Sequence, residues 1–324
     1  MCCTFRAMTT TTGRRSYDDV DGWRAYQRFF PPDLRVAEAA RPVEVWEPWG
    51  GYDVHVDAWR VAAPRGTVVL LHGAGGHGRL LGPLARAVNA LGWDAVAPDL
   101  PLFGLTRVPA PWRVRYADWV RVAVDAAAAE GAAGRPVVLL GLSVGGRLAY
   151  DAAADPRAHA AAVVASNLLD PRVPAVRRAA ARTALLAETA GLAALLPRRL
   201  LGLRVPVRWL TRLSRMSADP AVVAACAADA QGGGGRVPLG FFVDWTRSAP
   251  AVEPEQFRAC PVLLVQPAAD TWTPPALSVD FARRIAADTR VVLLERAGHL
   301  PVEQPGLDQL RAALAETLEL AARP

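Results

Sequence analysis

Gly141-Leu142-Ser143-Val144-Gly145-Gly146 is the stretch that decides the fold of this sequence. The apolar run Pro136–Leu140 precedes it and the periodic segment Ser143–Ala154 follows it, which predicts a buried strand, a tight turn and a helix. Glycines two residues before and after the serine keep side chains from colliding in such a turn. The helix start also offers backbone N–H groups to a developing negative charge. The pattern is typical of a nucleophile elbow, and the alternative is a small-residue turn without chemistry.

Strands and helices alternate on both sides of this stretch. The predicted strands are Val43–Glu47, Asp53–Val61, Thr67–Leu71, Asp94–Ala97, Pro136–Leu140, Ala161–Ala165, Val262–Gln266 and Arg290–Leu294. The predicted helices are Arg79–Leu91, Trp112–Glu130, Ser143–Ala154, Pro275–Ala287 and Gly306–Ala321. This order predicts an α/β protein with a mostly parallel central sheet flanked by helices.

The alternation breaks between about residues 170 and 250, where the chain shows no strand pattern, several Leu/Ala/Arg-rich helical stretches and the run Gly232–Gly235. We interpret this segment as an inserted helical cap or lid. The core is then split into residues 43–169 and 251–324, and residues 1–42 form an N-terminal extension, of which we expect about the first 15 to be disordered.

Composition narrows the chemistry. Hydrophobic residues make up 52% and charged residues 21%, as in ordinary globular proteins, and the net charge is +6. The sequence contains no lysine, which excludes a Schiff-base lysine. The four cysteines show neither zinc-site nor disulfide spacing, and a start at Met8 would remove two of them. With no signal pattern and no apolar run of about 20 residues, we expect a cytoplasmic protein. The serine chemistry inferred below needs no metal or organic cofactor, and we expect none.

A serine hydroxyl needs a base, and the base needs a group that orients it. His299 lies in Ala297-Gly298-His299-Leu300-Pro301, directly after the last predicted strand. Asp270 lies on the loop after the strand Val262–Gln266. The order Ser143, Asp270, His299 is that of a catalytic triad built on an α/β sheet. The alternative for Asp270 is an N-terminal cap of the helix near Pro275.

A second glycine-rich loop, His72-Gly73-Ala74-Gly75-Gly76, follows the buried strand Thr67–Leu71. We assign the backbone amides of Ala74 and Val144 to an oxyanion hole, with Gly73, Gly75, Gly141 and Gly145 as supporting positions. His72 is then expected to bond the loop backbone rather than act as a base. A phosphate-binding loop is the alternative, but the Lys-Ser/Thr ending of such loops is missing.

The 170–250 segment supplies the candidate pocket residues Trp209, Met216, Phe241, Phe242 and Trp245, for which ordinary core packing is the alternative. From Arg172 to Arg215 ten arginines stand against one acid, Glu188, a net charge of +9. The segment is either a solvated arginine-rich surface or a face that meets an anionic membrane or anionic substrate. Leu185, Leu192 and Leu196 share a helix face that suits a membrane interface or packing over the pocket. No motif for nucleic-acid binding accompanies the arginines.

From about Val43 to its end, the chain resembles the α/β-hydrolase superfamily, through Leu71-His72-Gly73-Ala74-Gly75, Gly141–Gly146, Asp270 and Gly298-His299. Within it, the chain is similar to the monoacylglycerol lipase and lysophospholipase branch, which carries an H-G-A-G type loop and a helical cap after the sixth strand. It departs from that branch at residues 99–106, where D-x-x-G-H-G-x-S is usual, and at Leu142 and Val144, where His and Met are common.

The resemblance implies an esterase or lipase-like serine hydrolase that cleaves a small-molecule ester with an apolar acyl group through an acyl-enzyme. Acyl transfer, C–C bond hydrolysis and cofactor-free peroxidation are alternatives on the same triad. A ligand-binding receptor that kept the pocket is an alternative of another class. The sequence does not indicate the oligomeric state.

Overall fold

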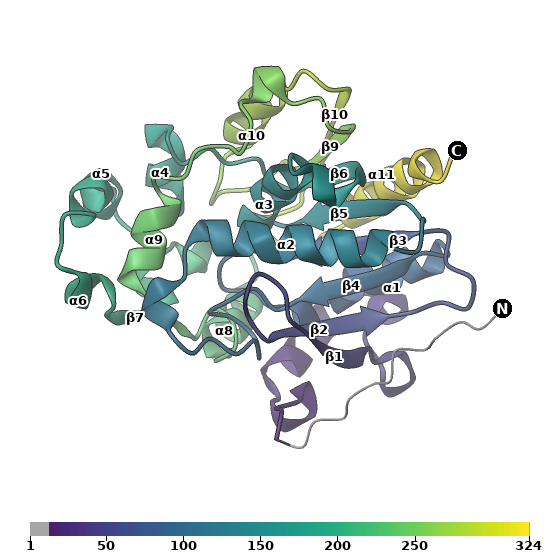
Figure 1. Ribbon diagram of the computed structural model, residues 1–324, viewed down its shortest axis with the longest axis horizontal. Helices are drawn as coiled ribbons and strands as arrows, with labels where there is room; N and C mark the ends of the chain where they lie inside the picture. The colour runs from purple at the N-terminus through teal and green to yellow at the C-terminus, as the bar shows by residue number, and fades with distance from the viewer. Residues whose placement is uncertain (1–12, 324) are drawn as a thin grey trace.

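The computed structural model describes residues 13–323, and its core is an eight-stranded sheet (Figure 1). The strands are β1 (Val43–Glu47), β2 (Val54–Trp59), β3 (Thr67–Leu71), β4 (Asp94–Pro98), β5 (Val137–Gly141), β6 (Ala160–Ala165), β9 (Val262–Pro267) and β10 (Thr289–Leu294). They lie in the order β1-β2-β4-β3-β5-β6-β9-β10. Only β2 runs against its neighbours β1 and β4, and the remaining pairs are parallel. The predicted mostly parallel sheet is therefore confirmed.

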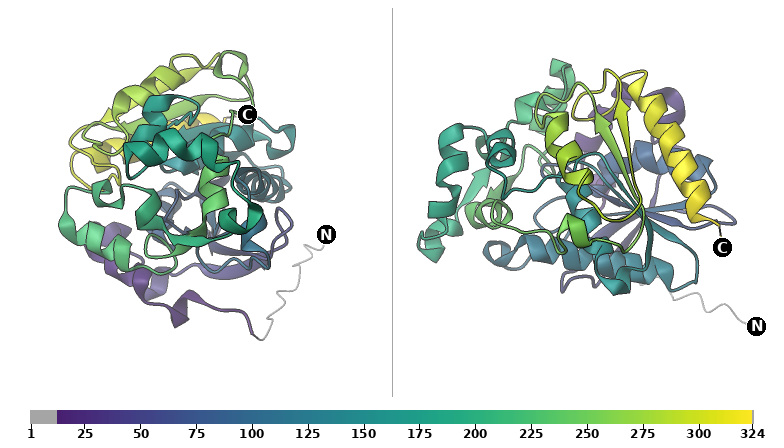
Figure 2. Two further views of the ribbon diagram at one scale, coloured as in Figure 1. Left: turned by 90° about the vertical axis from the view of Figure 1, so that its left-hand side faces the viewer. Right: turned by 90° about the horizontal axis from the view of Figure 1, so that it is seen from above.

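Helices cover both faces of this sheet because its central strands are apolar on both faces. Leu139 of β5 packs into a cluster that includes residues of α2 (Tyr116–Gly131), α3 (Val144–Ala153) and α10 (Pro275–Ala282). Its neighbour Leu140 packs into a separate cluster with residues of α1 (Gly82–Ala90) and α11 (Gly306–Ala321). The right-hand view of Figure 2 shows α11, in yellow, against one side of the strands. The sheet is thus the middle layer of three.

Two predicted helices are four or five residues short at one end, and α1 begins three residues after the predicted Arg79. The helix expected from Trp112 begins at Tyr116, because the Asp118 carboxylate accepts a hydrogen bond from the Arg115 N–H at 2.6 Å and caps the helix there. The helix expected to reach Ala287 ends at Ala282. Beyond it the chain tightens into i→i−3 turns, and the Ala286 N–H leaves the helix to bond the Pro254 carbonyl at 2.9 Å.

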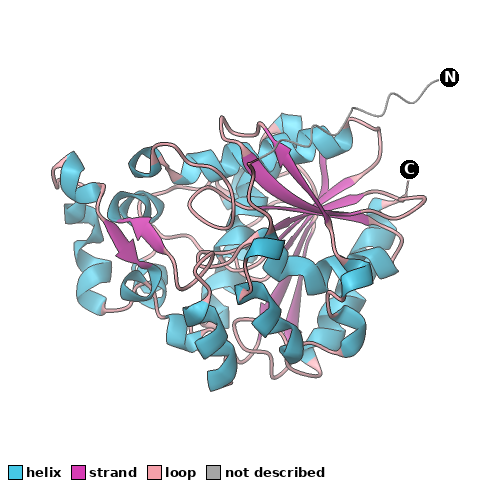
Figure 3. Cartoon of the chain, turned by 90° about the horizontal axis from the view of Figure 1, so that it is seen from below, coloured by secondary structure: helices cyan, strands magenta, loops and turns pink. Residues whose placement is uncertain are grey.

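The segment between about residues 170 and 250 holds mostly short helices, as predicted: α4 (Pro174–Ala180), α5 (Ala184–Ala193), α6 (Arg198–Leu201), α7 (Val207–Leu210), α8 (Pro220–Ala228) and α9 (Leu239–Trp245). It also contains an antiparallel ribbon of β7 (Arg204–Pro206) and β8 (Arg236–Pro238), which was not expected from the sequence. Strands of three residues are too short to show an alternating pattern. Figure 3 shows this ribbon apart from the large sheet.

Most leucines of α5 and of the turn after it face solvent, whereas Leu186 packs against the core. Leu185, Leu192 and Leu196 are all exposed, and so is Leu195. The interpretation in which this face packs over the pocket is therefore wrong. None of the helices in residues 13–323 is long and apolar enough to span a membrane.

The N-terminal extension packs onto the core through 3-10 turns at Tyr17–Asp19, Gly22–Phe29, Pro32–Leu34 and Glu38–Ala40. The Tyr17 side chain is fully buried, and its hydroxyl donates to the Asp99 carboxylate at 2.9 Å. Of the stretch that we expected to be disordered, residues 1–12 lie outside the described residues, and Arg14 pairs with Asp53 at 2.7 Å.

Candidate active site

Ser143 occupies the turn between β5 and α3 in a strained conformation, with φ of 56°. The turn is possible only because its flanking residues carry no side chain. A Cβ at Gly141 would lie 1.8 Å from the Gly145 carbonyl oxygen, and a Cβ at Gly145 would lie 2.2 Å from that of Leu71. The two glycines of the predicted elbow are thus required by close backbone contacts, and the turn places the serine at the carboxyl end of the parallel strands.

The structure brings the three predicted side chains together in one hydrogen-bonded line. His299 Nε2 lies 2.9 Å from Ser143 Oγ, and His299 Nδ1 lies 2.8 Å from Asp270 Oδ2. They come from the loops after β5, β9 and β10, which meet because parallel strands end at one edge of a sheet. Asp270 and His299 are buried. This arrangement is that of a nucleophile, a base and an orienting carboxylate.

Asp270 is held by its own loop and does not cap α10. Its Oδ1 accepts hydrogen bonds from the N–H groups of Trp272 and Thr273, each at 2.8 Å, and its Oδ2 accepts one from Thr273 Oγ1 at 2.7 Å. Burial opposes ionisation, but the hydrogen bonds from His299 and Thr273 outweigh it and hold the pKa of Asp270 below its usual value. The carboxylate therefore stays charged beside the histidine.

Two residues that the sequence analysis missed connect the serine turn to the acid. The Ser143 N–H donates to Ser166 Oγ at 2.8 Å, and Ser166 Oγ donates to Asn167 Oδ1 at 2.8 Å. Asn167 Nδ2 then donates to Thr273 Oγ1 at 3.0 Å, and it lies 3.3 Å from Asp270 Oδ2. The available signal was a polar Ser-Asn pair directly after the apolar strand β6.

The loop after β3 lies against the serine. Gly76 N–H bonds the Gly73 carbonyl at 3.1 Å, and a Cβ at Gly73 would lie 2.9 Å from Ser143 Cβ. Ala74 and Val144 line the same cavity as Ser143. No backbone acceptor in residues 13–323 takes a hydrogen bond from the Ala74 N–H, which leaves that donor available to a substrate oxygen.

His72 supports this loop, as expected. Its Nδ1 lies 2.8 Å from the Gly73 carbonyl oxygen, and its Nε2 accepts a hydrogen bond from the Leu100 N–H at 2.9 Å. These partners assign the neutral tautomer with the proton on Nδ1. Burial lowers the pKa of His72 to about 4, which agrees with a neutral ring.

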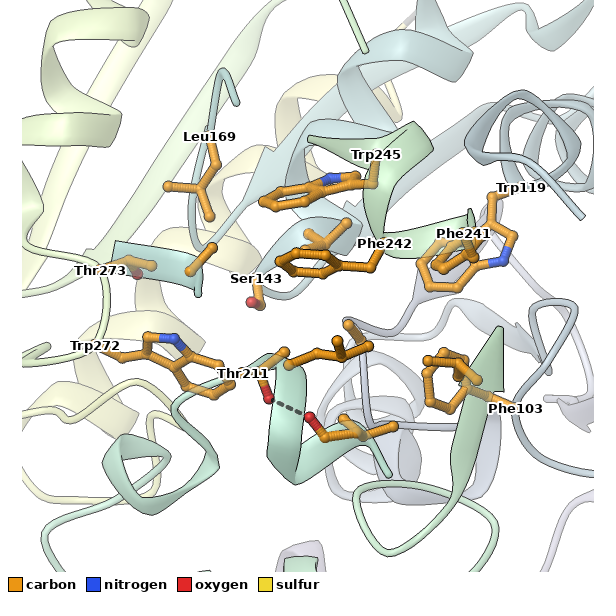
Figure 4. Close-up of a pocket in the computed structure, with 16 residues that line it drawn as sticks. Phe103, Trp119, Ser143, Leu169, Thr211, Phe241, Phe242, Trp245, Trp272 and Thr273 are labelled. Carbon is orange, nitrogen blue, oxygen red and sulfur yellow. Dashed lines mark hydrogen bonds between the residues drawn. The ribbon is translucent and has the colours of Figure 1, made fainter. Parts of the chain in front are cut away.

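Two cavities meet at Ser143 and Ala74. The first is lined mostly by apolar and aromatic side chains, among them the predicted Phe241, Phe242 and Trp245 of α9. Figure 4 shows these rings, with Trp119 and Phe103, around Ser143. The second is lined by His299, by the predicted Met216 and by Tyr26 of the N-terminal extension.

Trp209 does not line either cavity, and its assignment to the pocket is wrong. It belongs to the one-turn helix α7, whose inward positions are taken by the buried Val207 and Leu210. The helical period then turns Trp209 outward, where 56% of it is exposed.

The described residues contain one group with metal-ligating atoms close together, Glu44, His55 and Asp57. Arg79 already pairs with Asp57 at 2.7 Å and with Glu44 at 2.8 Å. Burial opposes protonation of His55, but Asp99 and Glu44 outweigh it and raise the pKa of His55 to about 10. Two cationic side chains therefore neutralise these carboxylates, which disfavours a metal ion there.

Comparisons with known proteins agree with this architecture. Residues 62–305 match the family described as serine aminopeptidase, S33. The structure is similar to that of a monoacylglycerol lipase from Paleococcus ferrophilus, with 23% identity over 83% of this chain and 99% of that chain and a TM-score of 0.66. It is also similar to a monoglyceride lipase from Saccharomyces cerevisiae, with 16% identity over 91% and 99% of the two chains and a TM-score of 0.70.

An epoxide hydrolase from Mycobacterium thermoresistibile shares the fold as well, with 20% identity over 86% of this chain and 98% of that chain and a TM-score of 0.58. No curated protein matches the sequence significantly. At these identities the solved structures establish the α/β-hydrolase fold, which several chemistries share.

Proposed function

We propose that this chain, which belongs to the serine aminopeptidase S33 family of α/β hydrolases, is a serine esterase that acts on an ester with an apolar acyl group. The observation that supports this most is the line from Ser143 Oγ through His299 to Asp270, with contacts of 2.9 Å and 2.8 Å. A receptor that only binds its ligand has no need of a complete base and orienting group.

In the proposed reaction, Ser143 Oγ attacks the ester carbonyl while His299 Nε2 takes its proton. The N–H groups of Ala74 and Val144 bind the oxyanion, each contributing about 3 kcal/mol to the barrier reduction. His299 then gives the proton to the leaving alcohol as the C–O bond breaks. His299 then deprotonates a water that attacks the acyl-enzyme carbonyl, and it gives that proton to Ser143 Oγ as the bond between Ser143 and the acyl group breaks and the acid is released.

The name of the family refers to aminopeptidases, but the cavities favour an uncharged ester over a peptide with a free amino terminus. An α-ammonium group needs a carboxylate partner when it is buried. The described side chains that line the two cavities include no Asp or Glu. The first cavity is instead walled by aromatic and aliphatic side chains, which suit a hydrocarbon acyl chain.

A substrate panel tests the proposal. We expect p-nitrophenyl esters to be hydrolysed with kcat/KM rising from acetate to octanoate, because each buried methylene adds about 0.8 kcal/mol of binding. Aminoacyl p-nitroanilides serve as the competing class. Turnover of these anilides without turnover of the esters would contradict the proposal.

A further inference from the structure

The two cavities at Ser143 differ in the catalytic groups that they contain. The first is lined by Val144, Trp272 and Thr273, and His299 is not among its lining residues. The second is lined by His299 and Leu300. Both contain Ala74 and Ser143, so the carbonyl of a bound ester would sit at their junction.

Proton transfer decides which half of an ester enters which cavity. The base that takes the serine proton must deliver it to the leaving oxygen, so that oxygen has to lie within hydrogen-bond reach of His299 Nε2. With the carbonyl oxygen on the amides of Ala74 and Val144, the leaving group extends along the His299 side and the acyl chain along the other.

The walls of the second cavity are largely apolar; besides the catalytic Ser143 and His299, their polar side chains are those of Tyr26, His72 and Cys226. Phe30, Leu80, Leu81 and Met216 contribute hydrocarbon or thioether surface. Burial raises the pKa of Tyr26 well above its usual value and that of the Cys226 thiol to about 11, so both stay neutral. His72, whose pKa burial lowers to about 4, is neutral as well. The described lining holds neither an arginine nor a carboxylate.

We propose that the second cavity is the leaving-group site and that it takes an apolar, uncharged alcohol rather than glycerol or a phosphate-bearing group. The inference rests on the esterase function proposed above. Of the two free hydroxyls of a glycerol ester, the unpaired Tyr26 hydroxyl could meet one, and the other would be buried against largely hydrocarbon walls. A phosphate would lack a cationic side-chain partner among the described lining residues. The substrate is then an ester with two apolar arms, one on each side of the carbonyl.

The N-terminal extension takes part in this selection. Tyr26 belongs to the 3-10 segment Gly22–Phe29, and Phe30 directly follows it; both are buried. Met216 and Cys226 come from the 170–250 segment and pack with Tyr26 in one cluster. The specificity for the alcohol therefore depends on residues outside the strands and loops that carry Ser143, Asp270 and His299.

The test uses the full chain and octanoate esters of methanol, hexanol and glycerol, with octanoate release measured. We expect kcat/KM for the hexyl ester to exceed that for the methyl ester by about tenfold or more, because each buried methylene adds severalfold. The glycerol ester should not exceed the methyl ester. Hydrolysis with no dependence on the alcohol, or a preference for glycerol, would overturn the inference while leaving the esterase function standing.

Cavity-filling variants assign the two arms. Met216→Trp should reduce the ratio of kcat/KM for hexyl octanoate to kcat/KM for methyl octanoate to near one. Leu80→Phe, a second variant that fills the same cavity, should lower this ratio as well. The matched control Ala180→Phe fills the first cavity, so it should keep that ratio and instead reduce the preference for hexyl octanoate over hexyl butyrate. Exchanged effects would show that the arms are reversed and overturn the inference.

Labelling by a fluorophosphonate confirms that each variant is folded. If the wild type is not labelled and turns over no ester, the esterase function itself fails.

Discussion

The backbone N–H of Ser143 donates a hydrogen bond to the Ser166 hydroxyl at 2.8 Å, which ties the serine turn to the end of β6. Through Asn167 the same chain of hydrogen bonds continues to Thr273 at 3.0 Å, next to Asp270. All of these side chains except that of Ser143 are buried. We infer that Ser166 and Asn167 are positioning residues that fix the distance between nucleophile and acid.

Replacing Asn167 with Leu should lower kcat for p-nitrophenyl butyrate by about tenfold with little change in KM, because a small misplacement of the catalytic groups slows chemistry more than binding. The rate of fluorophosphonate labelling should fall by the same factor. Asn89→Leu is the matched control, since Asn89 donates to the carbonyls of Trp59 and Trp93 away from the site. It should cost stability and leave kcat unchanged; an equal loss of kcat in both variants would assign Asn167 a purely structural role.

Asp270→Asn should reduce kcat by roughly 10³- to 10⁴-fold, because an amide can accept the loop N–H bonds but cannot stabilise the imidazolium of His299. The fold should survive, as circular dichroism can verify. Asp280→Asn is the control, because this carboxylate is exposed on α10. Retention of more than a tenth of the activity in Asp270→Asn would contradict its role.

The ion-pair cluster of Glu44, His55, Asp57, Arg79 and Asp99 predicts a pH dependence of stability. The pKa of His55 is raised from 6.5 in the unfolded chain to about 10 in the folded protein. The stability that the protonated His55 contributes is therefore fully present below pH 6.5 and is lost as the pH rises toward 10. Burial raises the pKa of Glu44, but His55 and Arg79 lower it more strongly, from 4.5 to about 2. The stability that the ionised Glu44 contributes is therefore present above pH 4.5 and is lost as the pH falls toward 2.

Urea unfolding across this range measures the effect. The free energy of unfolding should be highest between pH 4.5 and 6.5 and should decline above 6.5. His55→Gln should have a lower free energy of unfolding at pH 6, and that free energy should fall less steeply above pH 6.5 than in the wild type. A wild-type decline identical to that of the variant would mean that His55 does not carry the charge assigned to it.

We propose that the arginine-rich segment contacts anionic membranes through the exposed leucines of α5 and the turn after it. Each arginine near such a surface contributes about 1 kcal/mol, and salt screens this attraction over about 8 Å. We expect co-sedimentation with anionic vesicles at low salt, and less with neutral vesicles or at high salt. Leu192→Ser should weaken binding, whereas the control Leu320→Ser, at an exposed leucine of α11, should not. Equal binding to both kinds of vesicle, or none, would leave the segment as a solvated surface.

Much of the fold could be predicted because local signals and burial agree. The strand Thr67–Leu71 and the helix Gly306–Ala321 have the predicted bounds, since each is set by a continuous apolar pattern with clear ends. The elbow could be predicted because the contacts at Gly141 and Gly145 admit no other residue.

What could not be predicted depends on three-dimensional contacts. A single side-chain cap, from Asp118 to the Arg115 N–H, sets the start of α2 at Tyr116. The ribbon of β7 and β8 is too short to show an alternating pattern. Trp209 is exposed because its neighbours Val207 and Leu210 take the inward positions of a single turn. Ser166 and Asn167 reach the site through pairing with strands distant in sequence, which no local motif reveals.

The most direct test of the account is labelling with a fluorophosphonate followed by intact-mass and peptide mapping, on the wild type and on Ser143→Ala. The account predicts one adduct per chain, located on Ser143, loss of esterase activity in proportion to labelling, and neither adduct nor turnover in Ser143→Ala, whose activity should fall by several orders of magnitude. An adduct on a different residue, or a Ser143→Ala protein that keeps most of its esterase activity, would contradict the central claim that Ser143 is the nucleophile.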